Sequence, residues 1–186
     1  PDARVAEGIE HRLYLVEPGQ KKKCLMALVE EDEAEAMLVF VRRKVDADWI
    51  CRQLELQGHD VEKIHGDRTQ NQRVRALSGI RKGKHRILVA TDVAARGIDV
   101  PILEHIVQFD IPQTEEDYIH RAGRTARGAA GGTVSTIATW LDKEMIKRIE
   151  KAIDQKIPRC RTDAVEPYEE RKKTIKGRER VRRRLR

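Results

Sequence analysis

Short apolar runs of strand length alternate with amphipathic stretches of helical length from about residue 10 to residue 156. Six runs are rich in aliphatic residues and predict strands: His11–Val16, Met37–Val41, Val61–Ile64, Arg86–Ala90, His105–Phe109 and Thr133–Ile137. Continuous apolar runs such as 38–41 and 87–90 are typical of strands that are buried on both faces.

Four stretches between these runs carry apolar residues at helical spacing. They predict helices over Asp46–Leu56, Gln70–Arg81, Thr114–Ala122 and Asp142–Lys156, with Thr114 and Asp142 as candidate N-caps. Steady alternation of strand and helix requires crossover connections, which produce a parallel sheet. The predicted fold is therefore an α/β three-layer sandwich, with a mainly parallel sheet and helices on both faces. Ligands of such sheets bind at the carboxyl ends of the strands.

Composition sets limits on the kind of protein. Of the 186 residues, 39% are hydrophobic and only 4% are aromatic, so the core must be aliphatic. No apolar run approaches the roughly 18 residues that cross a bilayer, so we expect no membrane association. The cysteines Cys24, Cys51 and Cys160 are odd in number and lack metal-site spacing, which favours a reducing, cytoplasmic location over a disulfide scaffold. Because the first residue is Pro1 and not Met, we expect a piece of a longer polypeptide.

The positive charge lies almost entirely in a C-terminal tail. Residues 171–186 hold ten Lys and Arg against one acidic residue, whereas the rest of the chain is close to neutral. Such a run is typical of a solvated, poorly ordered segment. It also favours contact with nucleic-acid phosphates, since each paired cation releases counterions.

The first of three unusual strand-end segments is Thr91–Asp99, which follows a buried strand. It combines a hydroxyl group, the carboxylates of Asp92 and Asp99, and the guanidinium of Arg96. Threonine and backbone N–H groups suit phosphate oxygens, and a carboxylate suits ribose hydroxyls. An ordinary turn capped by Asp92 is an equally good interpretation of this segment alone. A metal site is not expected, because no third carboxylate is in register.

The second segment, His120–Gly128, contains three arginines at a spacing of three residues. On a continuing helix, Arg121, Arg124 and Arg127 would lie nearly on one side and repel one another unless anions face them. Guanidinium groups are preferred partners of transferring phosphoryl groups. The alternative is a solvent-exposed basic helix end, which the flanking glycines disfavour.

The third segment, Ile64–Arg73, passes from the end of a strand into the start of a helix. Free N–H groups at a helix start favour phosphate binding. A hydrogen-bonded turn with a polar N-cap explains the same residues equally well.

Together these segments resemble the conserved motifs of the DEAD-box RNA helicases. HRAGRTAR at His120–Arg127 resembles motif VI, ATDVAARGID at Ala90–Asp99 resembles motif V, and LVFVRRK at Leu38–Lys44 resembles motif IV. Gln70 and Arg73 match the Q-x-x-R element, and Asp110–Pro112 matches a D-x-P step. The resemblance covers about residues 10–156 and is to the second, RecA-like domain. Val39–Arg42 and the basic extension are most similar to bacterial members that act in large-subunit assembly.

The resemblance implies roles for individual residues around ATP. Arg124 and Arg127 correspond to the catalytic arginines that reach the γ-phosphate. Gly97, Asp99, His120 and Arg121 correspond to residues of ATP binding and interdomain coupling, with Asp99 on the ribose. Ala126 replaces a commoner glycine within motif VI.

Contacts with RNA are implied in the same way. The residues matched to the RNA backbone are Gly66, Gln70, Arg73, Thr91 and Arg96. Arg43 stands where many relatives have threonine, so the resemblance implies no hydroxyl contact there.

The chain lacks a GxxxxGK[ST] phosphate loop and an Asp-Glu-Ala-Asp run. In the family these belong to the first RecA-like domain, which holds most of the Mg²⁺·ATP. We therefore expect residues 1–9 to be a linker from that domain, 10–157 to be the helicase C-terminal domain, and 158–186 to be a partly disordered basic extension. The chain alone is expected to be inactive.

The resemblance implies the C-terminal half of an ATP-dependent RNA helicase, with ATP and Mg²⁺ as cofactors. The expected partners are the RNA backbone, the N-terminal RecA-like domain of the same protein, and pre-ribosomal particles. Two alternatives remain open. A DNA-directed helicase is disfavoured by His120, where such relatives often have glutamine. A non-catalytic RNA-binding module would use the basic tail as its binding surface.

Overall fold

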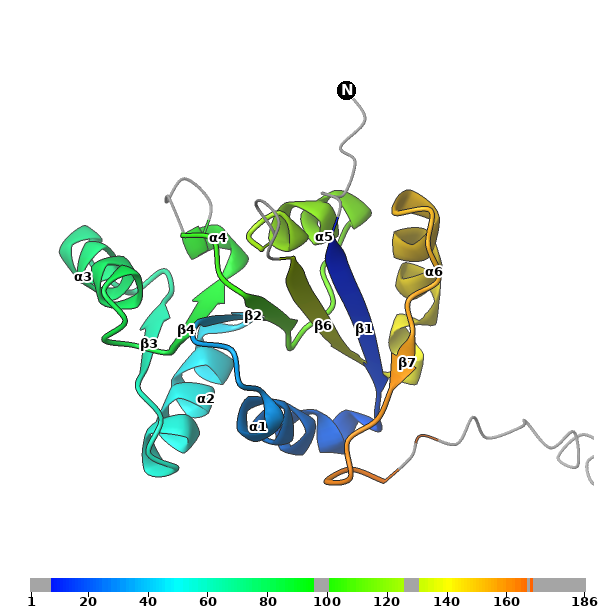
Figure 1. Ribbon diagram of the computed structural model, residues 1–186, viewed down its shortest axis with the longest axis horizontal. Coiled ribbons are helices and arrows are strands. Elements are labelled where there is room, and N and C mark those ends of the chain that lie inside the picture. Colours follow the sequence, from blue (N-terminus) through cyan, green and yellow to red (C-terminus); the bar gives the residue numbers. More distant parts are fainter. Residues whose placement is uncertain (1–7, 96–100, 126–130, 167, 169–186) are drawn as a thin grey trace, which may run out of the picture.

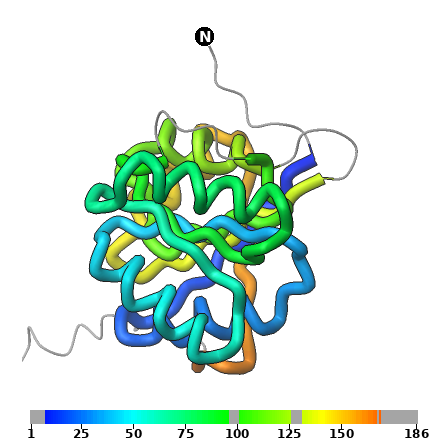
Figure 2. Tube along the Cα trace, turned by 90° about the vertical axis from the view of Figure 1, so that its left-hand side faces the viewer, coloured from blue at the N-terminus to red at the C-terminus, as the bar shows by residue number. Residues whose placement is uncertain are grey.

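The computed structural model describes residues 8–95, 101–125, 131–166 and 168. Within these residues one sheet lies between two layers of helices (Figures 1 and 2). Its seven strands are all parallel and follow the order β3-β4-β2-β5-β6-β1-β7. They are β1 (Ile9–Leu15), β2 (Met37–Val41), β3 (Val61–Ile64), β4 (Ile87–Thr91), β5 (His105–Gln108), β6 (Gly132–Ala138) and β7 (Arg159–Cys160).

Each face of the sheet has its own helices and its own hydrophobic core. One face packs against α1 (Lys21–Glu31) and α2 (Lys44–Leu56). The other packs against α3 (Gln70–Arg81), α4 (Asp92–Ala95), α5 (Glu115–Ala122) and α6 (Lys143–Ala152). Two short 3₁₀ helices, η1 (Pro18–Gln20) and η2 (Trp140–Asp142), follow β1 and β6. Among the described helices, none is long and apolar enough to cross a bilayer.

The predicted α/β sandwich is confirmed. The bounds of β2, β3 and α3 are as predicted, and every residue of β2, β4 and β5 is buried. Thr114 caps α5, because its Oγ1 accepts a hydrogen bond from the Asp117 N–H. The helix predicted from Asp142 to Lys156 is shorter, since the carboxylate of Asp142 caps η2 instead of α6 and the chain turns at Asp154 with a φ of 51°.

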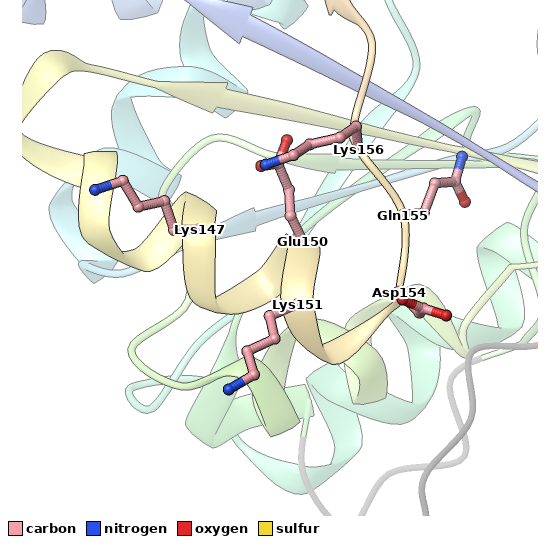
Figure 3. Close-up of a pocket in the computed structure, with 6 residues that line it drawn as sticks. All are labelled: Lys147, Glu150, Lys151, Asp154, Gln155 and Lys156. Carbon is pink, nitrogen blue, oxygen red and sulfur yellow. The ribbon is translucent and has the colours of Figure 1, made fainter.

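Strand β7 lies in the segment that the sequence indicated as an extension. Arg159–Cys160 pairs with Leu13–Tyr14 and extends the sheet beyond β1. Glu150 of α6 holds this end of the domain, because its buried carboxylate accepts hydrogen bonds from Lys156, Arg159 and the Ile157 N–H. Figure 3 shows Lys156 beside Glu150, whereas Lys147 and Lys151 point away from it. Burial opposes the ionisation of Glu150, but these donors outweigh it and lower the pKa of the carboxyl group.

A second buried polar group connects α1 to the middle of the sheet. His105 of β5 donates from Nδ1 to the Asp32 carboxylate after α1, and its Nε2 lies 2.8 Å from the Ser135 hydroxyl of β6. Ser135 is completely buried, so a substrate cannot reach its hydroxyl group. The hydrogen-bonded series Asp32–His105–Ser135 is therefore structural and not a catalytic triad. Burial raises the pKa of Asp32, but the hydrogen bonds from His105 and the Ala34 N–H outweigh burial and lower it below its usual 3.8.

We expect Asp32 to make the fold sensitive to acid. Because the folded-state pKa is lowered, the stabilisation by ionised Asp32 is present above the unfolded pKa and is lost as the pH falls below about 4. Asp32→Asn should cost about 2 kcal/mol of unfolding free energy at pH 7 and flatten the loss of stability as the pH falls below about 4. Urea denaturation of the wild type and the variant, at pH 7 and at lower pH values, measures the cost and the pH dependence. Parallel pH profiles of the two proteins would contradict the assignment.

Candidate functional site

The guanidinium of Arg121 is buried between the ends of two strands. Its side chain is only 4% exposed. Nε and Nη2 donate to the two oxygens of Asp92, at 2.8 and 2.6 Å, in a bidentate ion pair. Nη1 donates to Gln108 Oε1 at 3.0 Å and to the Asp110 carbonyl at 2.7 Å. The guanidinium also lies 4.9 Å from the ring centroid of Phe40. One side chain of α5 therefore joins the start of α4 to the end of β5.

Asp110 extends this group of contacts to motif IV. Its carboxylate accepts hydrogen bonds from Lys21 Nζ at 2.6 Å and from the Arg42 N–H at 2.8 Å. Burial opposes ionisation of Asp110, but these donors outweigh it and hold the pKa below its usual value. Arg42 Nη2 donates to the Ile111 carbonyl. The ends of β2 and β4, which carry motifs IV and V, are thus held by hydrogen bonds to each other and to α5, which carries the start of motif VI.

Arg121 and Arg124 do not share one side of a helix, so the prediction is wrong for this pair, and Arg127 lies outside the described residues. Helix α5 ends at Ala122, and Gly123 is its C-cap. The chain then turns back on itself, and Thr125 Oγ1 donates to the carbonyls of Leu103 and Glu104 ahead of β5. Arg121, which is still on the helix, points into the domain toward Asp92 and Gln108.

Arg124 lies in this turn and not on the helix. Its carbonyl accepts a hydrogen bond from the Leu103 N–H, which fixes the backbone. Its side chain is half-buried and makes no hydrogen bond or ion pair within the part of the chain that the structure describes. Arg124 is thus a positioned cation without a protein partner there. Because α5 runs antiparallel to β5, Arg124 lies toward the amino end of that strand and not at the carboxyl edge.

The start of α3 is organised by a capping box. Thr69 Oγ1 accepts from the Gln72 N–H at 3.2 Å, and Gln72 Oε1 accepts from the Thr69 N–H at 2.9 Å. This leaves Gln70 exposed. Arg73 is half-buried, and its Nε is buried without a partner among the described residues.

Gly66 is exposed just ahead of this helix. A Cβ added to it would meet no atom within 4 Å. Nothing in the described structure itself therefore requires glycine at this position. An approaching ligand would explain it.

The remaining predicted residues divide into two sets. Thr91 is buried at the end of β4, where it pairs with Val41, and His120 is exposed on α5. Arg96, Gly97, Asp99 and Arg127 lie outside the described residues. No group of three His, Cys, Asp or Glu side chains suited to a metal ion occurs among the residues that the structure describes.

Sequence reasoning missed two residues of the site. Gln108 accepts from Arg121, and Lys21 pairs with Asp110. A polar side chain in the otherwise apolar strand around Gln108 was a usable signal, because a buried amide needs partners. Lys21 gave no signal, since its partner lies 89 residues away along the chain.

Comparison with known proteins identifies the family. The family described as the helicase conserved C-terminal domain matches residues 20–129. The chain is a helicase C-terminal domain of the DEAD-box family. It is 39% identical over 153 residues to the RNA helicase CrhR of Synechocystis, and 40% identical over 151 residues to the ATP-dependent rRNA helicase RRP3 of Saccharomyces cerevisiae. These alignments cover 82% and 81% of this chain, but only 31% and 30% of the relatives.

Solved structures confirm the RecA-like fold. Escherichia coli SrmB bound to the regulator of ribonuclease activity A is similar, with a TM-score of 0.80 and 30% identity. That alignment covers 88% of this chain and 97% of the SrmB chain. A DEAD-box protein of Methanococcus jannaschii aligns with a TM-score of 0.76 and 33% identity, over 83% of this chain and 42% of that one.

The two described arginines of motif VI should respond differently to truncation. Arg121→Ala leaves Asp92 and Gln108 without their buried partner and should lower the free energy of unfolding by about 3–5 kcal/mol. Arg124→Ala removes no described contact and should change it by no more than about 0.5 kcal/mol. Urea denaturation of both variants measures the difference. Equal costs would contradict the division between an internal and a presented arginine.

Proposed function

We propose that the chain is the C-terminal half of an ATP-dependent RNA helicase. It closes on an N-terminal RecA-like domain, contributes arginines to the hydrolysis of ATP, and holds one RNA strand by its backbone. The single observation that carries this is Arg124, a cation in a fixed turn of motif VI without a described partner, in a chain of the DEAD-box family. The chain spans about a third of the length of its curated relatives, which leaves room there for the other half of the site.

The arginine arrangement suits phosphoryl transfer. Arg121 is neutralised inside the domain by Asp92, so it acts by holding motif V and motif VI in register. Arg124 has no side-chain partner among the described residues, so its donors would be available for an anion. Together with Arg127 it would neutralise charge on the γ-phosphate, where such arginines contribute about 10³–10⁵ in rate. His120, Gly97 and Asp99 would contact the nucleotide or the sister domain.

The residues present fit ATP as a shared substrate but do not fit Mg²⁺ as a ligand of this domain alone. Within the described chain, Asp92 and Asp110 are both engaged by cations, and no cluster of three metal-binding side chains exists. We therefore assign Mg²⁺ mainly to the N-terminal domain. The described residues of this chain would supply cations and no metal ligands.

The proposed RNA contacts lie where the backbone and polar side chains are open. Gly66 and Gln70 are exposed beside the start of α3, where N–H groups favour phosphate. Arg73, Thr91 and Arg96 complete the set that the family resemblance implies. Contacts of this kind reach phosphate and sugar, so recognition should be largely independent of sequence.

We further propose that the protein acts in ribosome assembly in the cytoplasm. One relative is named an ATP-dependent rRNA helicase, which supports pre-ribosomal particles as partners. All three cysteines are free thiols, and burial raises the pKa of Cys24 and Cys51 to about 12. Unpaired, unreactive thiols are typical of a reducing compartment.

The catalytic part of the proposal is tested in the protein that carries both RecA-like domains. Arg124→Ala should lower RNA-stimulated ATP hydrolysis by about 10³ or more without lowering stability, and Arg127→Ala should do the same. A phosphate-release assay measures the rate, and the 186-residue chain alone should give no turnover. Arg148→Ala, on the exposed face of α6, is the matched control and should retain the wild-type rate. Wild-type turnover by both motif VI variants, or stimulation by DNA equal to that by RNA, would overturn the proposal.

The proposed contact with RNA is tested by a substitution at Gly66. Gly66→Ala adds a methyl group in open space, so the melting temperature should stay within about 2 °C of the wild type. The same methyl group would obstruct a phosphate that approaches the backbone, and affinity for short single-stranded RNA should fall about tenfold. Fluorescence anisotropy measures the affinity. Gly19→Ala, which also adds a methyl group in open space, should bind normally. Unchanged affinity of Gly66→Ala would remove Gly66 from the RNA site.

A further inference from the structure

The segment around α3 is rich in basic residues and contains no acidic ones. Residues 68–91 contain no Asp or Glu, and their seven basic residues are Arg68, Arg73, Arg75, Arg81, Lys82, Lys84 and Arg86. The body of the protein is therefore close to neutral only on average. One region of it concentrates positive charge.

Helix geometry places part of this charge on the outer face of α3. Asn71, Arg75, Ser78 and Lys82 recur at the spacing of one helical stripe. The opposite side, with Ala76, Leu77 and Ile80, is buried against the sheet. Figure 2 looks from the β3 edge of the sheet, where α3 crosses in front of the strands. Arg75, Lys82 and Lys84 are all exposed.

Three of these cations have no protein partner among the described residues. Within the described part of the chain, none of Arg75, Lys82 and Lys84 makes an ion pair or a hydrogen bond through its side chain. The acidic residues just ahead of the segment are already used, since Glu62 pairs with Arg68 at 2.7 Å and Asp67 pairs with Lys44 at 2.8 Å. Arg86 is also internal, because it donates to carbonyls at the end of α1. Among the described residues of this segment, the exposed cations without a protein partner are therefore Arg75, Lys82 and Lys84.

Stabilisation of the helix dipole does not account for the pattern. Basic residues help at the last turn of a helix, which covers Lys82 as the C-cap of α3. Arg75 lies in the middle of the helix, and Lys84 lies beyond its end. An external anion accounts for all three.

We infer that Arg75, Lys82 and Lys84 form a phosphate-binding track that carries RNA beyond the Q-x-x-R element, and we call it the α3 track. This rests on the proposed function, because the track begins where Gln70 and Arg73 are proposed to hold RNA. The helix has 12 residues and is about 18 Å long, which gives a single strand room to follow it. Val74 is the only large hydrophobic side chain exposed on α3. A protein partner would need a broader apolar centre, so the chemistry favours a nucleic-acid backbone.

The test compares two triple variants of the 186-residue chain. The track variant is Arg75→Gln with Lys82→Gln and Lys84→Gln. The control is Arg52→Gln with Lys23→Gln and Lys151→Gln, which removes the same charge from exposed positions on α1, α2 and α6. Both keep the basic tail, so its contribution cancels. The probes are oligouridylates of about 6 and about 24 nucleotides, with binding measured by anisotropy between about 50 and 200 mM salt.

The track variant should bind the long probe at least about tenfold more weakly than the control does. Its slope of log affinity against log salt should be smaller by about 2, or about 0.7 for each lost phosphate contact. The short probe should bind both variants alike, because it is too short to leave the Q-x-x-R element.

Three results would overturn the α3 track. Equal binding of the long probe by both variants would show that the cations do not meet RNA and would leave the face to an acidic protein. Equal weakening of both probes by the track variant would show a general charge effect. Failure of the wild-type chain to bind either probe would overturn the proposed RNA site as well, whereas ATP hydrolysis in the two-domain protein tests that function separately.

Discussion

The buried guanidinium of Arg121 is the interaction on which the arrangement of the site depends. It donates hydrogen bonds to Asp92 at the start of α4, and to Gln108 and the Asp110 carbonyl at the end of β5. A charge this deeply buried is tolerated only when it is paired and hydrogen-bonded, so the two strand ends have little freedom to separate. Asp110 extends the restraint to Arg42 at the end of β2 and to Lys21 at the start of α1. Motifs that are distant in the sequence become one rigid unit.

Two arginines of one short segment lie in different surroundings, one inside this unit and one in the turn that follows it. Within four residues the chain moves from an arginine inside the domain to an arginine in a turn. Gly123 ends the helix between them, and the hydroxyl of Thr125 fixes the turn against the chain ahead of β5. Arg124 is therefore positioned by its backbone, while its guanidinium remains without a described protein partner. A cation held in this way suits a phosphate brought by another domain, because little ordering is left to be done at binding.

Much of the fold could be predicted from the sequence. The continuous apolar runs at β2 and β4 predicted strands buried on both faces, and the helical spacing predicted the bounds of α3 correctly. Strand β7 was not predictable, because two residues carry no periodic signal and their pairing with β1 depends on Glu150 and its partners. The end of α6 was misplaced for a similar reason, since a single left-handed residue at Asp154 turns the chain.

The sequence indicated the residue types of the candidate site, but it did not indicate the directions in which their side chains point. The spacing of Arg121 and Arg124 indicated a common helical face, and only the position of the C-cap at Gly123 separates them. Arg121 faces inward because Asp92 and Gln108 lie there, and both partners are remote in the sequence. The charge of α3 shows the same limit. Its composition is visible in the sequence, but only the structure shows that the side chains of Arg75 and Lys82 have no partner in the described part of the chain.

The most direct test of the central claim is a double-mutant cycle between Asp92 and Arg121. Unfolding free energies are measured for the wild type, Asp92→Ala, Arg121→Ala and the double variant. If the bidentate pair joins the two strand ends, the coupling free energy should be about 2–3 kcal/mol. A coupling below about 0.5 kcal/mol would show that the two side chains contribute independently and would contradict the account.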